Sequence, residues 1–401
     1  MIQDGARRRY MVPLALHRAG ILEQVFIDSF VGVGSLEERI GLLAGRLWPD
    51  LGRRILNLRC SDLQAARVIR NPGLALRARV GARRFATPEE SFLWTSGEVA
   101  KWIARVGFRH ANLLYGFIRN APPSTYRQAR AEGLCTVGEQ IIAPLEVEIA
   151  EMRRQVGRWP GWNDRETLVP PRAYREMEEQ TWELADHITC MSEYVRSGLI
   201  SVGVAPEKIS VLPYPWIDAT PRGAARGEGP LRVGFVGAVS LRKGAPYFLE
   251  TARRFDPRQA TFTMVGPIKV NREKLAPYRD HVRFVGPVPR SGIDDWLRRF
   301  DVFFFPSTCE GSAGAVMEAM ASGLPVLTTF NSGSRVRHGS DGFILPYDDI
   351  DGFELAIRRF ADDRETLRAM GQAARQRVLE YDLDAYQIDL KRLFQALVSE
   401  H

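Results

Sequence analysis

The chain has 401 residues, of which 45% are hydrophobic, 26% charged and 10% aromatic, and its formal net charge is +7. This composition is that of an ordinary globular protein, and the length favours two domains, because single cores stop growing at roughly 250–300 residues. There is no low-complexity tract and no solenoid repeat. No apolar run approaches the ~18 residues that cross a bilayer, and no signal peptide opens the sequence, so we expect a cytoplasmic protein.

Strands and helices alternate through the first half, which indicates a parallel, doubly wound sheet. The first strand would lie within Met1 to Gln3, and Gly5 would then occupy the turn into a helix. Gly5 either lets the backbone approach a phosphate or is an ordinary turn glycine. The strands expected after it cover residues 25–27, 54–59, 112–117, 135–142, 187–192 and 207–212. The helices expected between them cover residues 89–106, 125–132, 144–156, 171–184 and 193–201.

A proline- and glycine-rich stretch at residues 213–230 reads as an interdomain linker. It separates an N-terminal domain, residues 1–212, from a C-terminal domain, residues 231–380, and the helix in residues 381–401 is expected to return toward the first domain. The second domain has expected strands at residues 231–237, 261–265, 282–285, 302–305, 326–329 and 342–345. Its expected helices cover residues 245–255, 292–299, 351–359, 363–380 and 383–398.

The most informative stretch is residues 301–329, which reads as a buried strand, a small-residue loop, a helix and a second strand. Ser312 is the expected N-cap of that helix. Glu318 is the only charged residue between Glu310 and Arg335, and it lies among apolar neighbours. A buried carboxylate without a partner is costly, so we expect a polar partner. Two carboxylates would thus flank a helix N-terminus, which attracts anions.

A second loop with phosphate-binding character runs from Gly237 to Gly244, between a strand and a helix. It presents Arg242 and Lys243 at the carboxyl end of a parallel strand, where open α/β sheets bind ligands. Two adjacent cations there suit a diphosphate, although an Arg-Lys pair standing alone would more often be a solvated surface pair.

Together these motifs resemble the GT-B glycosyltransferases of family 4. The family's Gly-x-x-x-x-(Arg)-Lys-Gly loop is matched at residues 237–244, and its block of two glutamates with a Gly-x-Pro-Val tail is matched at residues 306–326. The resemblance is strong over residues 231–346 and weaker over residues 5–217. It implies two facing Rossmann-like domains, with the nucleotide sugar bound by the second.

The resemblance also implies a role for each matching residue. Glu310 would bind the donor sugar, Glu318 the ribose, and Arg242 and Lys243 the leaving diphosphate. Val288 would contact the base through its backbone. The remaining donor-binding positions that it implies are Gly237, Ser312, Ala313, Gly314 and Ala315. No metal and no cofactor are then needed, because the nucleotide sugar is a substrate.

Four positions depart from the family pattern. Ala238 replaces the usual arginine after the loop glycine, and Ser312-Ala313 replaces Phe-Gly. In the first domain Gly138 stands where the family often has a histidine, which leaves Glu139 as the nearest group able to take a proton or bind an acceptor. Glu139 is either an active-site residue or a structural acid at the end of a strand.

Metal-binding patterns are weak. The four cysteines are far apart and read as buried thiols in a reducing compartment. Two Asp-x-Asp pairs begin at Asp349 and Asp382, and we interpret them as acids at helix N-termini.

The sequence therefore predicts a retaining, metal-independent glycosyltransferase (EC 2.4) that acts on a glycan or lipid-linked acceptor in surface polysaccharide or glycolipid synthesis. Retention is implied by the resemblance alone. The arginine-rich first domain is either a solvated surface or a contact with the anionic inner face of the membrane, and nucleic acid is not expected as a partner. The alternatives are a nucleotide-sugar epimerase of the same fold and a non-catalytic subunit that binds the donor.

Overall fold

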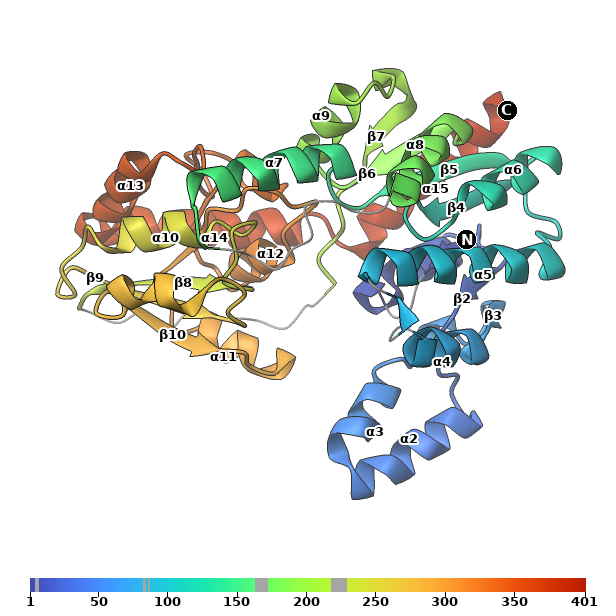
Figure 1. Ribbon diagram of the computed structural model, residues 1–401, viewed down its shortest axis with the longest axis horizontal. Helices are drawn as coiled ribbons and strands as arrows, with labels where there is room; N and C mark the ends of the chain where they lie inside the picture. The colour runs from blue at the N-terminus through green and yellow to red at the C-terminus, as the bar shows by residue number, and fades with distance from the viewer. Residues whose placement is uncertain (4–6, 82–83, 86, 163–171, 218–228) are drawn as a thin grey trace.

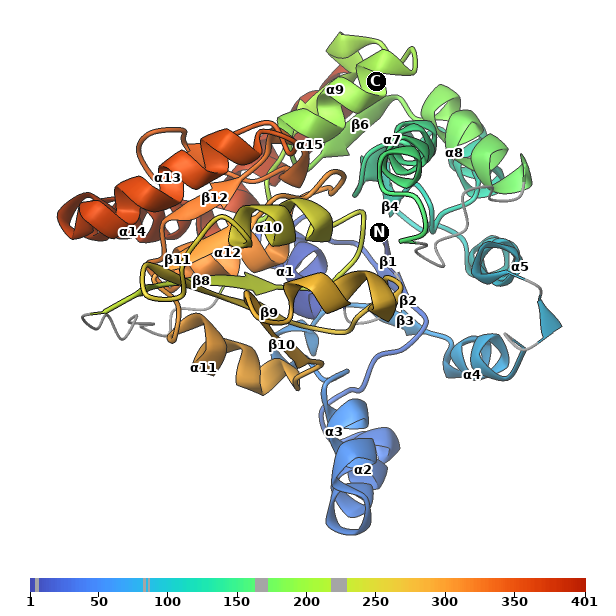
Figure 2. The same ribbon diagram turned by 60° about the vertical axis from the view of Figure 1, so that its left-hand side comes forward.

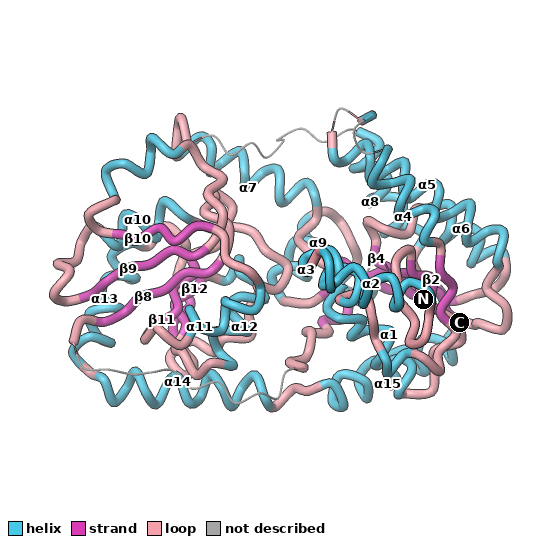
Figure 3. Tube along the Cα trace, turned by 90° about the horizontal axis from the view of Figure 1, so that it is seen from below, coloured by secondary structure: helices cyan, strands magenta, loops and turns pink. Residues whose placement is uncertain are grey.

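The computed structural model describes residues 1–3, 7–81, 84–85, 87–162, 172–217 and 229–401. Two separate sheets form the two ends of the molecule (Figure 1, Figure 3). Gly5 and most of the expected linker lie outside the described residues.

The first sheet has seven parallel strands in the order β3-β2-β1-β4-β5-β6-β7. Its strands are β1 (Ile2–Gln3), β2 (Val25–Ile27), β3 (Val68–Arg70), β4 (Leu113–Phe117), β5 (Cys135–Gln140), β6 (His187–Cys190) and β7 (Ile209–Val211). The helices in this part are α1 (Met11–Arg18), α2 (Leu36–Leu47), α3 (Pro49–Leu56), α4 (Pro72–Gly81), α5 (Pro88–Val106), α6 (Pro123–Ala131), α7 (Leu145–Arg158), α8 (Arg172–Leu184) and α9 (Glu193–Ser201).

The second sheet has six parallel strands in the order β10-β9-β8-β11-β12-β13. Its strands are β8 (Leu231–Val236), β9 (Ala260–Val265), β10 (Val282–Gly286), β11 (Val302–Phe305), β12 (Val326–Thr328) and β13 (Gly342–Ile344). Its helices are α10 (Ala245–Ala252), α11 (Ile293–Leu297), α12 (Gly314–Ala321), α13 (Ile350–Asp362) and α14 (Arg364–Leu379), and α15 (Leu383–Glu400) follows. Chain order reverses between β8 and β11, so the loops after these two strands open at a topological switch point.

The two predicted sheets and their parallel strands are confirmed, and so is the return of the last helix. Helix α15 packs on α1, and Tyr386, Leu390 and Phe394 share a buried cluster with Met11 and Leu16. No described helix combines the length and the apolarity that a membrane span requires.

The region between β2 and β3 differs from the prediction. Of residues 54–59, expected as a strand, the first three end α3, which has Pro49 in its first turn, the next two form a turn, and Arg59 makes an isolated bridge with Val31. The third strand is instead β3, and α2 was not anticipated. Together α2 and α3 form a hairpin that projects from the body of the protein (Figure 2).

Helix α7 connects the two halves. It starts beside the first sheet, and it runs alongside α10 of the second (Figure 1). Met152 and Trp162 belong to the hydrophobic core around the second sheet. The Tyr247 hydroxyl on α10 donates to Gln155 Oε1 at 2.6 Å, and Arg158 pairs with Asp348 at 2.7 Å. The proposed boundary at residue 212 therefore separates the strands of the two sheets but not every side chain that packs beside them.

Truncating the α15 anchor should destabilise the first half. Phe394 is 6% exposed and its ring lies 5.1 Å from that of Tyr115. We expect Phe394→Ala to lower the free energy of unfolding by about 3 kcal/mol, because it leaves a cavity between α15 and β4. Urea titration followed by tryptophan fluorescence measures the change. Ile388→Ala, at a position 53% exposed on the same helix, should change it little.

Candidate functional site

The loops after β8 and β11 are packed directly against each other. Gly244 has φ +71°, and a Cβ there would overlap the backbone carbonyl of Pro306. The carbonyl oxygen of Arg242 accepts hydrogen bonds from Thr308 N at 2.9 Å, from Ser307 Oγ at 3.0 Å and from Thr308 Oγ1 at 3.0 Å. These contacts bring the basic loop beside the loop that carries Glu310.

Three of the predicted site residues meet at this edge of the second sheet. Lys243 Nζ lies 2.6 Å from Glu310 Oε1, and Arg242 Nη1 lies 3.5 Å from the same oxygen. Arg242 also donates to the carbonyl of Cys309 at 3.3 Å, and Lys243 lies 5.1 Å from the centre of the Phe305 ring. The three side chains are 13–22% exposed, so this cluster is partly shielded from water yet accessible. Gly237 starts the loop with φ +154°, and a Cβ there would lie 3.2 Å from Lys243 Cδ.

Gly311 brings the first half of the chain to the site. A Cβ on Gly311 would overlap the carbonyl oxygen of Ile141, which follows β5. The carbonyl of Gly311 accepts a hydrogen bond of 2.6 Å from Ser192 Oγ, at the start of α9. Gly333, with φ +59°, packs against the other side of that carbonyl. The residue directly after Glu310 is therefore fixed between two segments of the first half and one of the second.

The N-terminus of α12 follows this contact, one residue later than predicted. The helix begins at Gly314 with Ala313 as N-cap, and no side chain caps it, so the expectation that Ser312 is the N-cap was wrong. The N–H of Ala313 donates to Ser332 O at 3.0 Å, which takes it out of the set of predicted anion donors. Within the described residues, no backbone hydrogen bond occupies the N–H groups of Gly314 and Ala315. Both are half-buried and remain candidates.

Glu318 has the polar partner that its burial required. It is 6% exposed on α12 and forms an ion pair with Arg290, whose side chain is 72% exposed. Arg290 follows β10 by a short loop that also contains the half-buried Val288. Glu318, predicted to bind the ribose, is thus paired with the loop that contains Val288, predicted to contact the base. Arg290 was missed by sequence reasoning, although the lack of any cation between Glu310 and Arg335 indicated that the partner comes from another segment.

Glu139 is placed in a different environment from Glu310. It lies near the carboxyl end of β5, is 3% exposed, and accepts a hydrogen bond of 2.6 Å from the Tyr115 hydroxyl. Burial, followed by the charge of Glu139, raises the pKa of Tyr115 well above its ordinary value, so this tyrosine stays a neutral donor.

The neighbouring Gly138 has a steric explanation. A Cβ there would lie 2.9 Å from Ile118 Cγ1 and 3.5 Å from the Tyr126 hydroxyl. Any side chain at this position would require Ile118 to move.

A buried network holds the turn between β5 and α7, which carries Ile141 to the site. Glu178 is 2% exposed and accepts hydrogen bonds from Arg119 Nε at 3.0 Å, Gln140 Nε2 at 2.8 Å and Leu145 N at 2.7 Å. Sequence reasoning missed this network because its members are distant in the chain. The network is complete in hydrogen bonds, as a buried charge requires.

The predicted acidic pairs are helix caps. Asp349 accepts a hydrogen bond from Gly352 N at 2.9 Å at the start of α13. Asp382 accepts from Asp384 N and Ala385 N at the start of α15. Both acids are therefore committed to backbone N–H groups.

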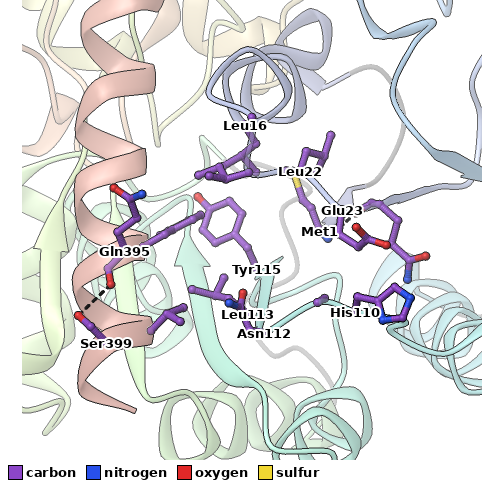
Figure 4. A pocket seen from close by; sticks show the side chains of 16 residues that line it. Met1, Leu16, Leu22, Glu23, His110, Asn112, Leu113, Tyr115, Gln395 and Ser399 are labelled. Carbon is purple, nitrogen blue, oxygen red and sulfur yellow. Dashed lines mark hydrogen bonds between the residues drawn. The ribbon is translucent and has the colours of Figure 1, made fainter.

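A separate cavity of about 500 Å³ lies between α1, α15 and the amino end of β4 (Figure 4). Met1, Leu16, Leu22, Tyr115, Phe394 and Val398 supply its apolar lining. None of the predicted site residues lines it. Ligands of parallel sheets bind at the opposite, carboxyl ends of the strands.

Residues 230–363 match the sequence model of the family described as glycosyl transferases group 1. This match lies in the part of the chain that holds the second sheet. The D-inositol 3-phosphate glycosyltransferase of Kribbella flavida is 28% identical over 226 residues, which cover 49% of this chain and 53% of that protein. The UDP-Gal:alpha-D-GlcNAc-diphosphoundecaprenol alpha-1,3-galactosyltransferase of Escherichia coli is 28% identical over 200 residues, covering 44% and 51%. The chain thus matches about half the length of these relatives.

Solved structures of the same fold cover the whole chain. Sucrose-phosphate synthase from Thermosynechococcus elongatus superposes with a TM-score of 0.68 at 16% identity and covers 100% of this chain and 96% of that one. Anabaena HepE in complex with UDP-glucose superposes with a TM-score of 0.59 at 14% identity, covering 93% and 99%. The chain therefore has the predicted GT-B fold.

The contact at Gly311 should tolerate no side chain. We expect Gly311→Ala to lower the melting temperature by several degrees, because its Cβ has to displace the backbone at Ile141. Differential scanning calorimetry measures the change. Gly97→Ala on α5, where nothing lies within 4 Å of the added methyl group, should leave the melting temperature equal or higher. An unchanged melting temperature in Gly311→Ala would contradict the close approach.

Proposed function

We propose that this protein is a retaining, metal-independent glycosyltransferase that moves a sugar from a nucleotide-diphosphate sugar to a glycan or lipid-linked acceptor. The observation that carries the proposal is the cluster of Lys243, Arg242 and Glu310 beside the N-terminus of α12. It offers positive charge for a diphosphate and a carboxylate for sugar hydroxyls at one point. Retention rests on the resemblance to the family.

The proposed reaction breaks the bond between the anomeric carbon of the donor sugar and the diphosphate oxygen. That oxygen takes the electron pair, an acceptor hydroxyl bonds to the same carbon, and its proton leaves to a base or to water. Negative charge grows on the leaving diphosphate, so fixed cations there lower the barrier. Lys243 and Arg242 supply this charge, and the N–H groups of Gly314 and Ala315 add to it.

Glu310 neutralises Lys243 and Arg242 through its two ion pairs. When the donor binds, its diphosphate replaces the carboxylate at the cations, and the sugar hydroxyls become donors to Glu310. Glu318 exchanges Arg290 for the ribose hydroxyls in the same way.

The donor proposed is a UDP-sugar. HepE is solved with UDP-glucose, and the matched Escherichia coli relative is named for UDP-Gal and a lipid diphosphate acceptor. With such an acceptor, the proposed reaction would take place in the cytoplasm at the inner face of the membrane, in polysaccharide or glycolipid synthesis. The acceptor would approach from the first half, where Glu139, near the carboxyl end of β5, remains a candidate.

Removing either partner of the central ion pair should abolish turnover. We expect Glu310→Gln and Lys243→Ala each to lower kcat/KM by on the order of 10²–10³, because one loses the hydroxyl acceptor and the other the charge on the leaving group. Sugar transfer is measured by UDP release with a panel of acceptors. Lys101→Ala, at an exposed ion pair on α5, is the matched control.

The same assay separates the alternatives. Conversion of the donor sugar without any acceptor would identify an epimerase, and UDP binding without turnover in the wild type would identify a non-catalytic subunit. EDTA should leave the rate unchanged, since the two side chains take the place of a metal. Full activity in Glu310→Gln would overturn the proposal.

Nucleotide binding should depend on Glu318. We expect Glu318→Gln to weaken UDP binding by roughly tenfold, because a neutral amide accepts hydroxyl hydrogen bonds less strongly than a carboxylate. Isothermal titration calorimetry with UDP measures the affinity. Glu365→Gln, an exposed position on α14, should bind UDP as the wild type does. Equal affinities in both variants would remove Glu318 from the proposed site.

A further inference from the structure

The hairpin of α2 and α3 exposes an unusual amount of apolar surface. Seven large hydrophobic side chains that are exposed in the described chain lie within residues 36–51: Leu36, Ile40, Leu42, Leu43, Leu47, Trp48 and Leu51. The hairpin stands away from both sheets (Figure 2), so no other described part of the protein covers these side chains. Soluble monomers rarely leave a contiguous apolar patch of this kind without a partner.

Glycines rather than leucines pack between the two helices. A Cβ on Gly52 would overlap the backbone of Gly45, and a Cβ on Gly41 would lie 2.8 Å from Ile55 Cγ2. Gly41, Gly52 and Ala44 are buried, whereas the leucines of α2 are exposed. This arrangement is the reverse of a water-facing hairpin, and it matches helices that contact each other through small residues while lipid surrounds their large ones.

The outward side chains of α2 form one stripe. Leu36, Ile40, Leu43 and Leu47 are spaced by four, three and four residues, which places them on a single helix face. Their exposures are 70%, 48%, 61% and 71%. Trp48, 62% exposed, closes the stripe at the junction with α3. Tryptophan is the side chain that bilayer interfaces favour.

The charges that remain unneutralised on the hairpin are positive. Arg39 and Arg46 are exposed on α2, and neither has an acidic partner among the described residues. The acids are already paired: Glu38 with Arg59 at 3.0 Å, Glu37 with Arg70 at 3.5 Å, and Asp50 with Arg53 at 3.1 Å. An apolar stripe beside free arginines is complementary to anionic headgroups over acyl chains. A second copy of the chain would instead bring like charges together.

The hairpin is fixed at its base. The Tyr10 hydroxyl lies within hydrogen-bond distance of two carbonyl oxygens, that of Leu58 at 2.9 Å and that of Ser29 at 3.0 Å. Val31 and Arg59 form a backbone bridge. A partner surface to which the hairpin binds would therefore hold the first half of the protein in one orientation.

We propose that α2 and α3 form a membrane-docking hairpin that inserts its Leu36–Leu47 stripe and Trp48 into the headgroup region of an anionic bilayer. The enzyme then lies on the membrane without spanning it. This inference does not depend on the proposed reaction, because it rests on the hairpin alone.

Vesicle flotation of the full chain at low ionic strength tests it. The vesicles are pure phosphatidylcholine in one arm and an equal mixture with phosphatidylglycerol in the other. We expect binding to the anionic vesicles only. The double variant Leu43→Ser with Leu47→Ser should lower the partition coefficient by on the order of a hundredfold, because two leucines no longer leave water. Arg39→Gln with Arg46→Gln should lower it by about tenfold.

Matched controls lie in the second half. Leu355→Ser changes a leucine that is 71% exposed on α13, and Arg279→Gln changes an exposed arginine, and both should bind as the wild type does. All variants should keep the wild-type melting temperature and UDP affinity, since the changed side chains are exposed. Failure of the wild type to float with anionic vesicles would overturn the proposal, as would unchanged flotation of the leucine variant. A stable dimer in light scattering that the leucine variant dissociates, without vesicle binding, would assign the hairpin to a second copy instead.

Discussion

The candidate site depends on two places where backbone meets backbone with no room for a side chain. At Gly244 the basic loop rests on the carbonyl of Pro306, and at Gly311 the acidic loop rests on Ile141 from the first half. Any larger residue at either point would push apart the segments that carry Lys243 and Glu310. The geometry of the charges is thus set by the absence of two Cβ atoms, and the ion pair forms between segments that are already in place.

The charges of the site balance one another. Each charge loses part of its hydration in this partly buried place, so a carboxylate paired with two cations costs less free energy than any of the three charges alone. The same argument applies to Glu318, whose partner Arg290 is largely in water. Cations held in this way exchange their carboxylate only for a group of comparable negative charge.

Much of this arrangement could be predicted from the sequence. The near-continuous apolar runs of β8 and β11 predicted both strands. The glycine-containing loops that follow them predicted that Arg242, Lys243 and Glu310 lie at the carboxyl edge of the second sheet. The need for a partner of Glu318 was also predictable from its apolar neighbours. Its identity was not, because Arg290 lies in another loop, and helix capping shifted by one residue from Ser312 to Ala313. Residues 54–59 read locally as a strand, but Pro49 and the packing of Gly52 on Gly45 favour a helix. The Arg119–Glu178 network was unpredictable because only the fold brings its members together.

Helix α7 has a consequence for how the chain can be divided. Its first turn is held by Glu178 beside the first sheet, whereas Met152 in the middle of the helix and Trp162 shortly after its end belong to the core of the second. A helix of 14 residues spans about 21 Å, so it acts as a strut between the halves. A fragment that begins after residue 212 would leave behind two apolar side chains from its own core. The two sheets are therefore separate in topology and have separate hydrophobic clusters, but Met152 of α7 belongs to the cluster around the second sheet.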